Sequence, residues 1–308
     1  MRFGISPGHE LVHAVRAIAS PTRHPLPWSW LAPGGRAVPA EAFETLRLVI
    51  GEFGYAPDFF TSNPSWDLTP EMEMDRLAHA DLDTLRVDLR KRVTRTSGAQ
   101  RRALQDLHDD PRRARQFIVA AARAFWSSAM SPHWAQLERL LRHDIAVRSR
   151  TAASAGIGAM ARDLNSAISW GDRAVVVQLE HHREELDCSG SGLVLIPSIL
   201  GRQCAVLTEP PAQPTIFYPI LGLRPLRELD PSTIEERLAG VMGLGRARLL
   251  ARMHEPLSTS ELAAETGLAL ATVSHHLSRL RTAGLVQASR DGARRIHSRT
   301  PVGDALVT

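Results

Sequence analysis

The chain has 308 residues, of which 44% are hydrophobic and 23% are charged, enough for one large domain or two ordinary domains with their own cores. This composition excludes a mainly disordered chain, and no apolar run approaches the roughly 18 residues that cross a bilayer. The N-terminus lacks a secretory signal pattern, and Cys188 and Cys204 form no metal-binding or redox motif. We therefore expect a cytoplasmic protein with no membrane association.

Helical periodicity dominates the first half of the chain. A helix capped by Ser6 is expected to end before Pro21, and a loop rich in Pro, Gly and Trp is expected over residues 21–39. Further helices are expected in residues 40–53, 70–94 and 99–130, with a break near Pro111, and from Ser131 toward Ile168.

The pattern changes after Gly171. Short segments rich in β-branched residues, at 174–179, 193–199, 205–208 and 215–218, predict an antiparallel β meander of three to five strands. Two prolines, Pro225 and Pro231, mark a linker. We therefore expect an N-terminal effector or dimerisation domain over residues 1–225, helical to about residue 170 with the β meander at about 172–222. The C-terminal domain would span residues 226–308. The predicted fold class is mainly α (α+β).

The positive charge is concentrated at the C-terminal end. The net charge of the chain is +4, and residues 244–308 alone contain nine arginines against five acidic residues. Every Trp, Phe and Tyr lies at or before Tyr218. Because proteins that hold single strands stack bases on aromatic rings, a basic segment without aromatic residues favours duplex DNA as its polyanion.

The segment from Leu244 predicts a helix-turn-helix. A first helix should end before Pro256, and Ser258 to Glu261 should open a second helix that closes at Gly267. A third helix is expected over Leu270 to Ala283. Such an arrangement sets two short helices at a large angle, as in many proteins that bind DNA.

The third helix has two distinct faces. Val273, Leu277 and Leu280 share one side, and small, polar and basic residues populate the other. After Gly284, two strands are expected on either side of Asp291-Gly292, a strong hairpin signal. The residues expected to contact DNA on this helix and hairpin are Thr272, Ser274, His275, Arg279, Arg281, Arg290, Arg294 and Arg295.

The segments Thr272 to Leu277, Leu280 to Val286 and Arg290 to Arg294 together resemble the recognition helix and wing of ArsR-type bacterial repressors. The resemblance covers residues 238–300. It is to the longer ArsR-type regulators, which have an extra N-terminal domain. It implies a winged helix-turn-helix, a homodimer and an inverted-repeat operator.

The chain also departs from that family. The cysteine pair or carboxylate/histidine set of its metal-sensing members has no counterpart here, since residues 260–266 lack cysteine and the last helix offers only Asp304. Ala269 stands where a serine would cap the recognition helix, and Ile296-His297 occupies a wing position often held by Tyr.

An alternative starts from residues 9–13, which match H-E-x-x-H, the pattern in which two histidines bind zinc and the glutamate acts as a base. In this alternative, His9 and His13 would bind a metal ion. The protein would then be a metal-responsive regulator or a zinc-dependent hydrolase with a fused DNA-binding module. The glycine and third histidine of the metzincin extension are absent at Arg16 and Ala19. The sequence therefore favours a protein that is not an enzyme and has no metal or cofactor.

The first 225 residues need a role of their own. Aromatic residues are expected to line an apolar pocket for a small molecule: Trp28, Trp30, Phe59, Phe60, Trp66 and Trp126. The sequence thus predicts a sequence-specific regulator of transcription that binds double-stranded DNA, a repressor whose DNA affinity is modulated by that small molecule.

Overall fold

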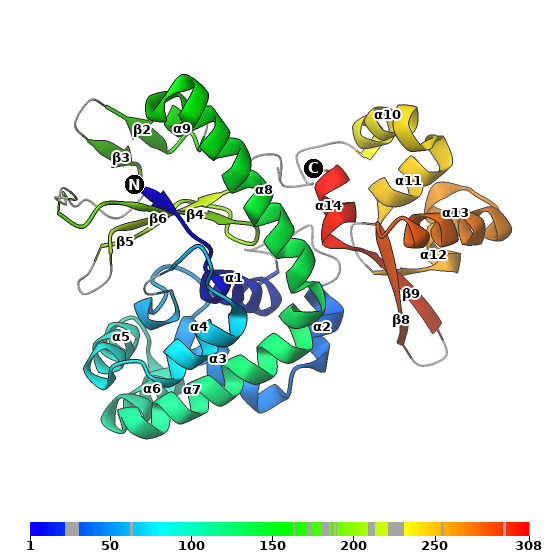
Figure 1. Ribbon diagram of the computed structural model, residues 1–308. Helices are drawn as coiled ribbons and strands as arrows, with labels where there is room; N and C mark the ends of the chain where they lie inside the picture. The colour runs from blue at the N-terminus through cyan, green and yellow to red at the C-terminus, as the bar shows by residue number, and fades with distance from the viewer. Residues whose placement is uncertain are drawn as a thin grey trace.

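The computed structural model describes the chain except for residues 22–30, 62–63, 163, 172–173, 180–184, 186–187, 189, 209–212, 221–230, 254–255, 292–293 and 308. The side chains of residues 32–33, 231–233, 291 and 294 also lie outside the description. The fold is mainly helical with small sheets, which confirms the predicted fold class (Figure 1). None of the described helices is long and apolar enough to cross a membrane.

The N-terminal helices follow the predicted periodicity in part. They are α1 (Pro7–Ala19), α2 (Leu31–Ala37), α3 (Ala40–Ile50), the 3-10 turn η1 (Asp58–Phe60), α4 (Pro70–Ala78), α5 (Leu82–Thr94), α6 (Gly98–Asp109), α7 (Pro111–Phe125), the π turn η2 (Trp126–Met130), α8 (Ser131–Ala155) and α9 (Ile157–Arg162). The helix expected over residues 70–94 is divided at residues 79–81, and the helix expected from Ser131 toward Ile168 ends at Ala155, before Gly156 with its φ of 86°.

Local signals fix where these helices begin. The Ser6 hydroxyl accepts a hydrogen bond from the His9 backbone N–H at 3.1 Å, and Pro7 occupies the first turn of α1. The predicted break near Pro111 is confirmed, because Asp110 caps α7 by accepting from the Arg113 N–H at 3.1 Å.

Helix α2 corrects the prediction of a loop through residues 21–39. Its glycines allow close packing, since a Cβ on Gly34 would lie 2.9 Å from the Ala129 Cα and one on Gly35 would lie 2.7 Å from Ile18. Contacts with the rest of the fold therefore stabilise a helix that contains one proline and two glycines, which are poor helix formers.

The main sheet is mixed. It contains β1 (Arg2–Phe3), β4 (Val194–Ser198), β6 (Thr215–Pro219) and β5 (Ala205–Leu207), in that spatial order. Strand β5 pairs antiparallel with β6, and β2 (Ile168–Trp170) pairs antiparallel with β3 (Val175–Val177). Strands β1 and β6, however, both run parallel to β4. The predicted strands are therefore present, but the expected simple meander is wrong, because β6 is inserted between β4 and β5.

Alternate side chains of the sheet face different layers. Leu195, Ile216 and Tyr218 pack with Met160 and neighbouring residues of the α9 region, whereas Phe217 lies on the opposite face, stacked on His9 of α1. Figure 1 shows α8 and α9 on one side of the sheet and α1 on the other. The N-terminal part is thus built as helices around a small central sheet.

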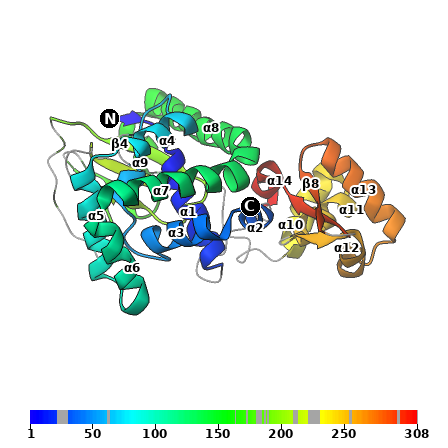
Figure 2. The same ribbon diagram turned by 90° about the horizontal axis from the view of Figure 1, so that it is seen from below.

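The C-terminal elements have a separate hydrophobic core. They are α10 (Pro231–Met242), α11 (Leu244–Arg252), β7 (Leu257–Ser258), α12 (Thr259–Thr266), α13 (Leu270–Thr282), β8 (Val286–Asp291), β9 (Arg294–Arg299) and α14 (Pro301–Val307). Their buried apolar residues, from Ile234 to Val307, form a cluster of their own. Helix α14 contacts α8, and the two helices lie side by side in Figures 1 and 2.

Candidate DNA-binding interface

Helices α10 and α11 form the base of the C-terminal unit. Leu249 and Leu250 of α11 and Met253 directly after it are fully buried. Glu235 on α10 forms ion pairs with Arg248 at 3.1 Å and with Arg252 at 3.3 Å. Two of the nine C-terminal arginines therefore fix one helix to another.

Helix α12 has a complete capping box. The Ser258 hydroxyl accepts from the Glu261 N–H at 3.3 Å, and the Glu261 carboxylate accepts from the Ser258 N–H at 2.7 Å. The helix ends at Gly267, whose φ of 68° is in the left-handed region that favours glycine. The turn before α13 is therefore built as predicted.

Helix α13 presents a polar face to solvent. Val273, Leu277 and Leu280 are at most 2% exposed and hold the helix on the core. The five predicted DNA contacts on this helix are all exposed: Thr272, Ser274, His275, Arg279 and Arg281. The exposed surface has no carboxylate and no aromatic ring apart from imidazole. Its side chains are slim enough to enter a major groove about 12 Å wide.

His276 lies on the flank of α13 and packs over α11. A Cβ added to Gly245 would come within 2.6 Å of the His276 Nε2 atom, so a side chain at residue 245 would displace the ring. Burial, aided by Arg246 and His275, lowers the pKa of His276. The sequence does not indicate that Arg246 lies near His276, because nothing local to α11 shows which helix its residues will face.

Strands β8 and β9 form the predicted wing, and β7 extends it to a three-stranded sheet. Arg290 and Arg295 are directly opposite each other across the hairpin, and both side chains are exposed. The side chain of Arg294 and residues 292–293 lie outside the described residues. Like charges directly opposite one another destabilise a hairpin. The pair therefore lowers stability in the free protein and would be neutralised by phosphate groups.

The wing and the recognition helix converge on His297. This histidine is 3% exposed, and its Nε2 atom lies 3.2 Å from the Thr259 hydroxyl. Burial is the main cause that lowers its pKa to about 4, and the Arg295 and Arg281 cations add to the effect. Arg281 at the end of α13 and Arg295 on the wing therefore both lie near enough to His297 to act on its imidazole.

A buried ion pair joins the wing to the last helix. Arg299 and Asp304 are both 0% exposed, and the Arg299 Nε lies 2.7 Å from the Asp304 Oδ1. The Arg299 guanidinium also donates to the Leu250 carbonyl at 3.0 Å. Asp304, the one acidic residue of the last helix, is therefore used for packing β9, α11 and α14 together.

The first four H-E-x-x-H residues of α1 are buried in the core, and His13 is half-buried. The His9 ring is 5% exposed and is stacked on Phe217, with 4.1 Å between ring centroids and 4.5 Å to the His13 ring. Both Glu10 carboxylate oxygens accept backbone N–H groups, from Ile199 and Leu200, at 2.9 Å each.

These contacts argue against a zincin site. Burial raises the pKa of Glu10 to about 7 and lowers that of His9 to about 3. The residue that would serve as the base instead joins α1 to the end of β4. Within the described ranges, no group of three or more His, Cys, Asp or Glu residues is placed to hold a metal ion.

The aromatic residues proposed for ligand binding are dispersed. Phe59 and Phe60 contact each other in the core, and Trp126 packs edge-on against Trp134 at 5.1 Å. Trp66 is 49% exposed and lies under the Arg142 guanidinium. Trp28 and Trp30 fall outside the described residues. Of the four described candidates, Phe59, Phe60 and Trp126 thus lie in the core, whereas Trp66 lies at the surface.

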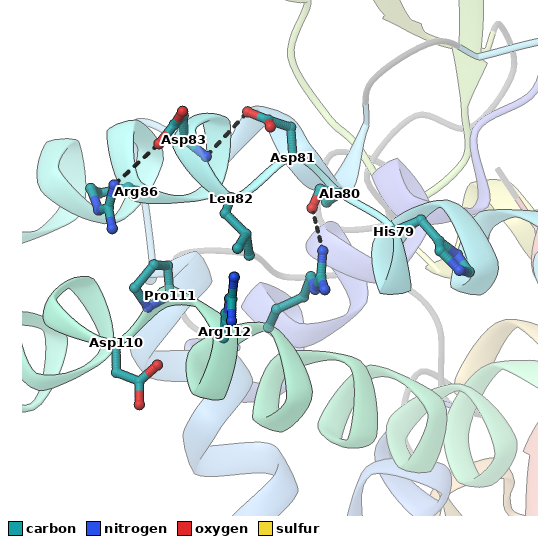
Figure 3. A pocket seen from close by; sticks show the side chains of 10 residues that line it. His79, Ala80, Asp81, Leu82, Asp83, Arg86, Asp110, Pro111 and Arg112 are labelled. Atoms are coloured by element: carbon teal, nitrogen blue, oxygen red, sulfur yellow. Dashed lines mark hydrogen bonds and ion pairs between the residues drawn. The ribbon is translucent and has the colours of Figure 1, made fainter.

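A pocket of about 640 Å³ lies elsewhere, between the start of α5 and the start of α7 (Figure 3). Leu82 and Arg112 point toward one another from the facing helices, and Arg115 donates to the Ala80 carbonyl at 2.8 Å. Acidic, basic and apolar residues line the pocket: His79, Ala80, Asp81, Leu82, Asp83, Arg86, Asp110, Pro111, Arg112 and Arg115. None of the described aromatic candidates lines it.

Comparison with known proteins addresses the C-terminal part. Residues 248–288, which extend from α11 through α12 and α13 into β8, match the model of a family described as bacterial regulatory protein, arsR family. No curated protein and no solved structure matches the chain. The match includes the capping box, Gly267 and the exposed face of α13. Residues 248–288, in the C-terminal part of this 308-residue chain, therefore form an arsR-family regulator domain, which supports a DNA-binding regulator of transcription.

Proposed function

We propose that the chain is a repressor that binds a specific sequence of double-stranded DNA and responds to a small molecule held by its N-terminal domain. Helix α13 would enter the major groove, with His275 and Ser274 at base edges and Thr272 and Arg279 beside them. Arg281, Arg290, Arg294 and Arg295 would contact phosphates at the C-terminal end of α13 and along the wing.

The observation that carries this proposal is the set of exposed arginines on α13 and the wing: Arg279, Arg281, Arg290 and Arg295. They have a different environment from Arg248 and Arg252, which are paired with Glu235 of α10. Arg290 and Arg295 oppose each other across the hairpin, an arrangement that favours a polyanion as partner.

We further propose a homodimer on an inverted repeat. One recognition helix reads only a few base pairs, so affinity and specificity both require two half-sites. Two copies of α13 related by a twofold axis would enter successive major grooves about 34 Å apart. The operator would therefore be palindromic, with half-site centres separated by about 10 base pairs.

The domain division 1–225 and 226–308 is part of the proposal. It is supported by the separate apolar cluster of the C-terminal elements. Helix α14 lies against α8 and is held to β9 by the Arg299–Asp304 pair. A ligand with different affinities for two arrangements of these helices would shift the fraction of protein able to bind DNA.

The experiment that tests the function is selection of bound fragments from a pool of random duplexes by the full chain. We expect enrichment of one inverted repeat, and recovery that changes when particular metabolites are added. A reporter gene with the selected site at its promoter should then be expressed less in the presence of the protein. Recovery no greater than that of the unselected pool would overturn the proposal, and increased expression would overturn the repressor assignment.

A further inference from the structure

The N-terminal tip of α13 is apolar and exposed. Ala269, Leu270 and Ala271 are all exposed, and Leu270 retains 54% of its accessible surface. Leu268, two residues earlier, packs against the C-terminal core, but Leu270 takes no part in that cluster. A large aliphatic side chain is therefore left in water at the start of the recognition helix.

Packing within the chain does not account for this leucine. The residue at the N-cap, Ala269, makes no capping hydrogen bond with its side chain, so the tip presents no polar side chain before Thr272. Ser274 lies one turn after Leu270 on the same side of the helix, and His275 lies one turn after Ala271. The exposed face thus begins with apolar groups and continues with hydrogen-bonding groups.

The position of Leu270 determines what it can meet on DNA. Residues at the N-terminal end of a recognition helix are the ones that reach base edges. In the major groove, the C5 methyl of thymine is the one apolar feature among edges that otherwise carry hydrogen-bond donors and acceptors. An exposed leucine therefore matches thymine and offers nothing to the polar edges of guanine or cytosine.

We propose that Leu270 packs on the C5 methyl of one thymine in each half-site and so selects thymine at that position. The inference rests on the proposed DNA-binding function. In this arrangement, Leu270 reads a methyl group, and Ser274 and His275 read the hydrogen-bonding pattern of neighbouring base pairs. The complex buries an apolar surface that the free protein exposes.

Replacing thymine by uracil tests the contact, because uracil differs from thymine only in lacking the C5 methyl. The thymines of a duplex obtained by selection are replaced one at a time, and dissociation constants are measured at one fixed salt concentration for the wild-type chain and Leu270→Ala. At one thymine per half-site, we expect the wild type to lose about fourfold in affinity, the factor that corresponds to about 0.8 kcal/mol for one buried methyl-sized group. Leu270→Ala should bind the thymine and uracil duplexes equally.

Leu244→Ala is the matched control, since Leu244 is 52% exposed at the start of α11 and lies outside the recognition helix. It should keep the thymine preference of the wild type. Equal affinity of the wild type for every thymine and uracil pair, or an undiminished preference in Leu270→Ala, would overturn the inference while leaving DNA binding intact. Failure of the wild type to prefer any duplex would instead overturn the proposed function.

Discussion

Arg290 and Arg295 occupy directly opposed positions on β8 and β9, and both guanidinium groups are exposed to solvent. In the free protein their repulsion opposes the hairpin that carries them. A hairpin built in this way is suited to a partner that supplies negative charge on one side, as the backbone of a duplex does.

The first prediction follows from that opposition. Arg295→Ala should weaken binding to all duplex sequences, and the slope of log affinity against log salt should become less steep by about 0.9 for the lost phosphate contact. Because a repulsive pair is removed, the free energy of unfolding should not fall, and should rise by up to about 1 kcal/mol.

Titrations at several salt concentrations, together with urea unfolding, measure the two effects separately. Arg101→Ala, at an exposed arginine of α6, is the control and should change neither the slope nor the affinity. A wild-type slope in Arg295→Ala would show that this arginine is not a phosphate contact.

The second prediction concerns base reading by α13. His275 is exposed on the polar face of the helix, and its replacement by Ala should cost about 1 to 3 kcal/mol of discrimination at particular base pairs. Competition between the selected duplex and variants changed at single positions measures this loss. His143→Ala, at an exposed histidine of α8, should keep full discrimination. An equal loss on selected and random duplexes would make His275 a backbone contact.

The third prediction concerns the buried pair that joins the wing to α14. Arg299→Met leaves the Asp304 carboxyl without its cation in a fully buried site, at an expected cost of about 3 kcal/mol or more in the free energy of unfolding. Adding Asp304→Leu removes the buried acid and should restore most of the loss. Chemical denaturation of the two variants gives the comparison. A double variant no more stable than Arg299→Met would contradict the account of the pair.

The fourth prediction is a pH dependence of stability. Burial is the largest cause that raises the pKa of Glu73 to about 8 and that of Glu10 to about 7, above the usual value of 4.5. The folded state therefore binds these protons more tightly than the unfolded state, and the resulting stability is lost as pH rises. Between pH 6.5 and 8 the free energy of unfolding should fall, by up to about 1.4 kcal/mol per pH unit for each carboxyl.

His9 does not obscure this window, because burial lowers its pKa to about 3 and its ordinary value is 6.5. Glu73→Gln removes the carboxyl whose pKa is raised to about 8, and it should make the decline between pH 6.5 and 8 shallower. Glu41→Gln, at an exposed position of α3, should keep the decline of the wild type. A Glu73→Gln profile as steep as the wild-type profile would contradict the prediction.

The features that the sequence predicted well have local causes. The starts of α1 and α12 depend on Ser6 and Ser258, because each serine hydroxyl accepts a hydrogen bond from the backbone N–H three residues later. Gly267 adopts the positive φ expected of a helix end, and the apolar spacing of Val273 and Leu277 places the core face of α13. These signals operate within a few residues, so one sequence is enough to interpret them.

The features that were missed depend on distant partners. Strand β1 is only two residues long and exists because Arg2 and Phe3 pair with Val194 and Leu195. The parallel pairing of β4 with β6 likewise depends on distant residues, because β6 lies between β4 and β5 although β5 precedes it in the chain. The abundance of aromatic residues before residue 219 does not indicate where each one lies in the fold. Phe59 and Trp126 are core residues, and Trp66 lies at the surface.

The most direct test of the central claim is the ratio of two dissociation constants, one for the duplex obtained by selection and one for a scrambled duplex of the same length and composition, measured with the full chain at moderate salt. We predict a ratio of at least about 10³ in favour of the selected duplex, reduced by His275→Ala. A ratio of about one, at low as well as moderate salt, would contradict the claim that α13 and the wing read duplex DNA.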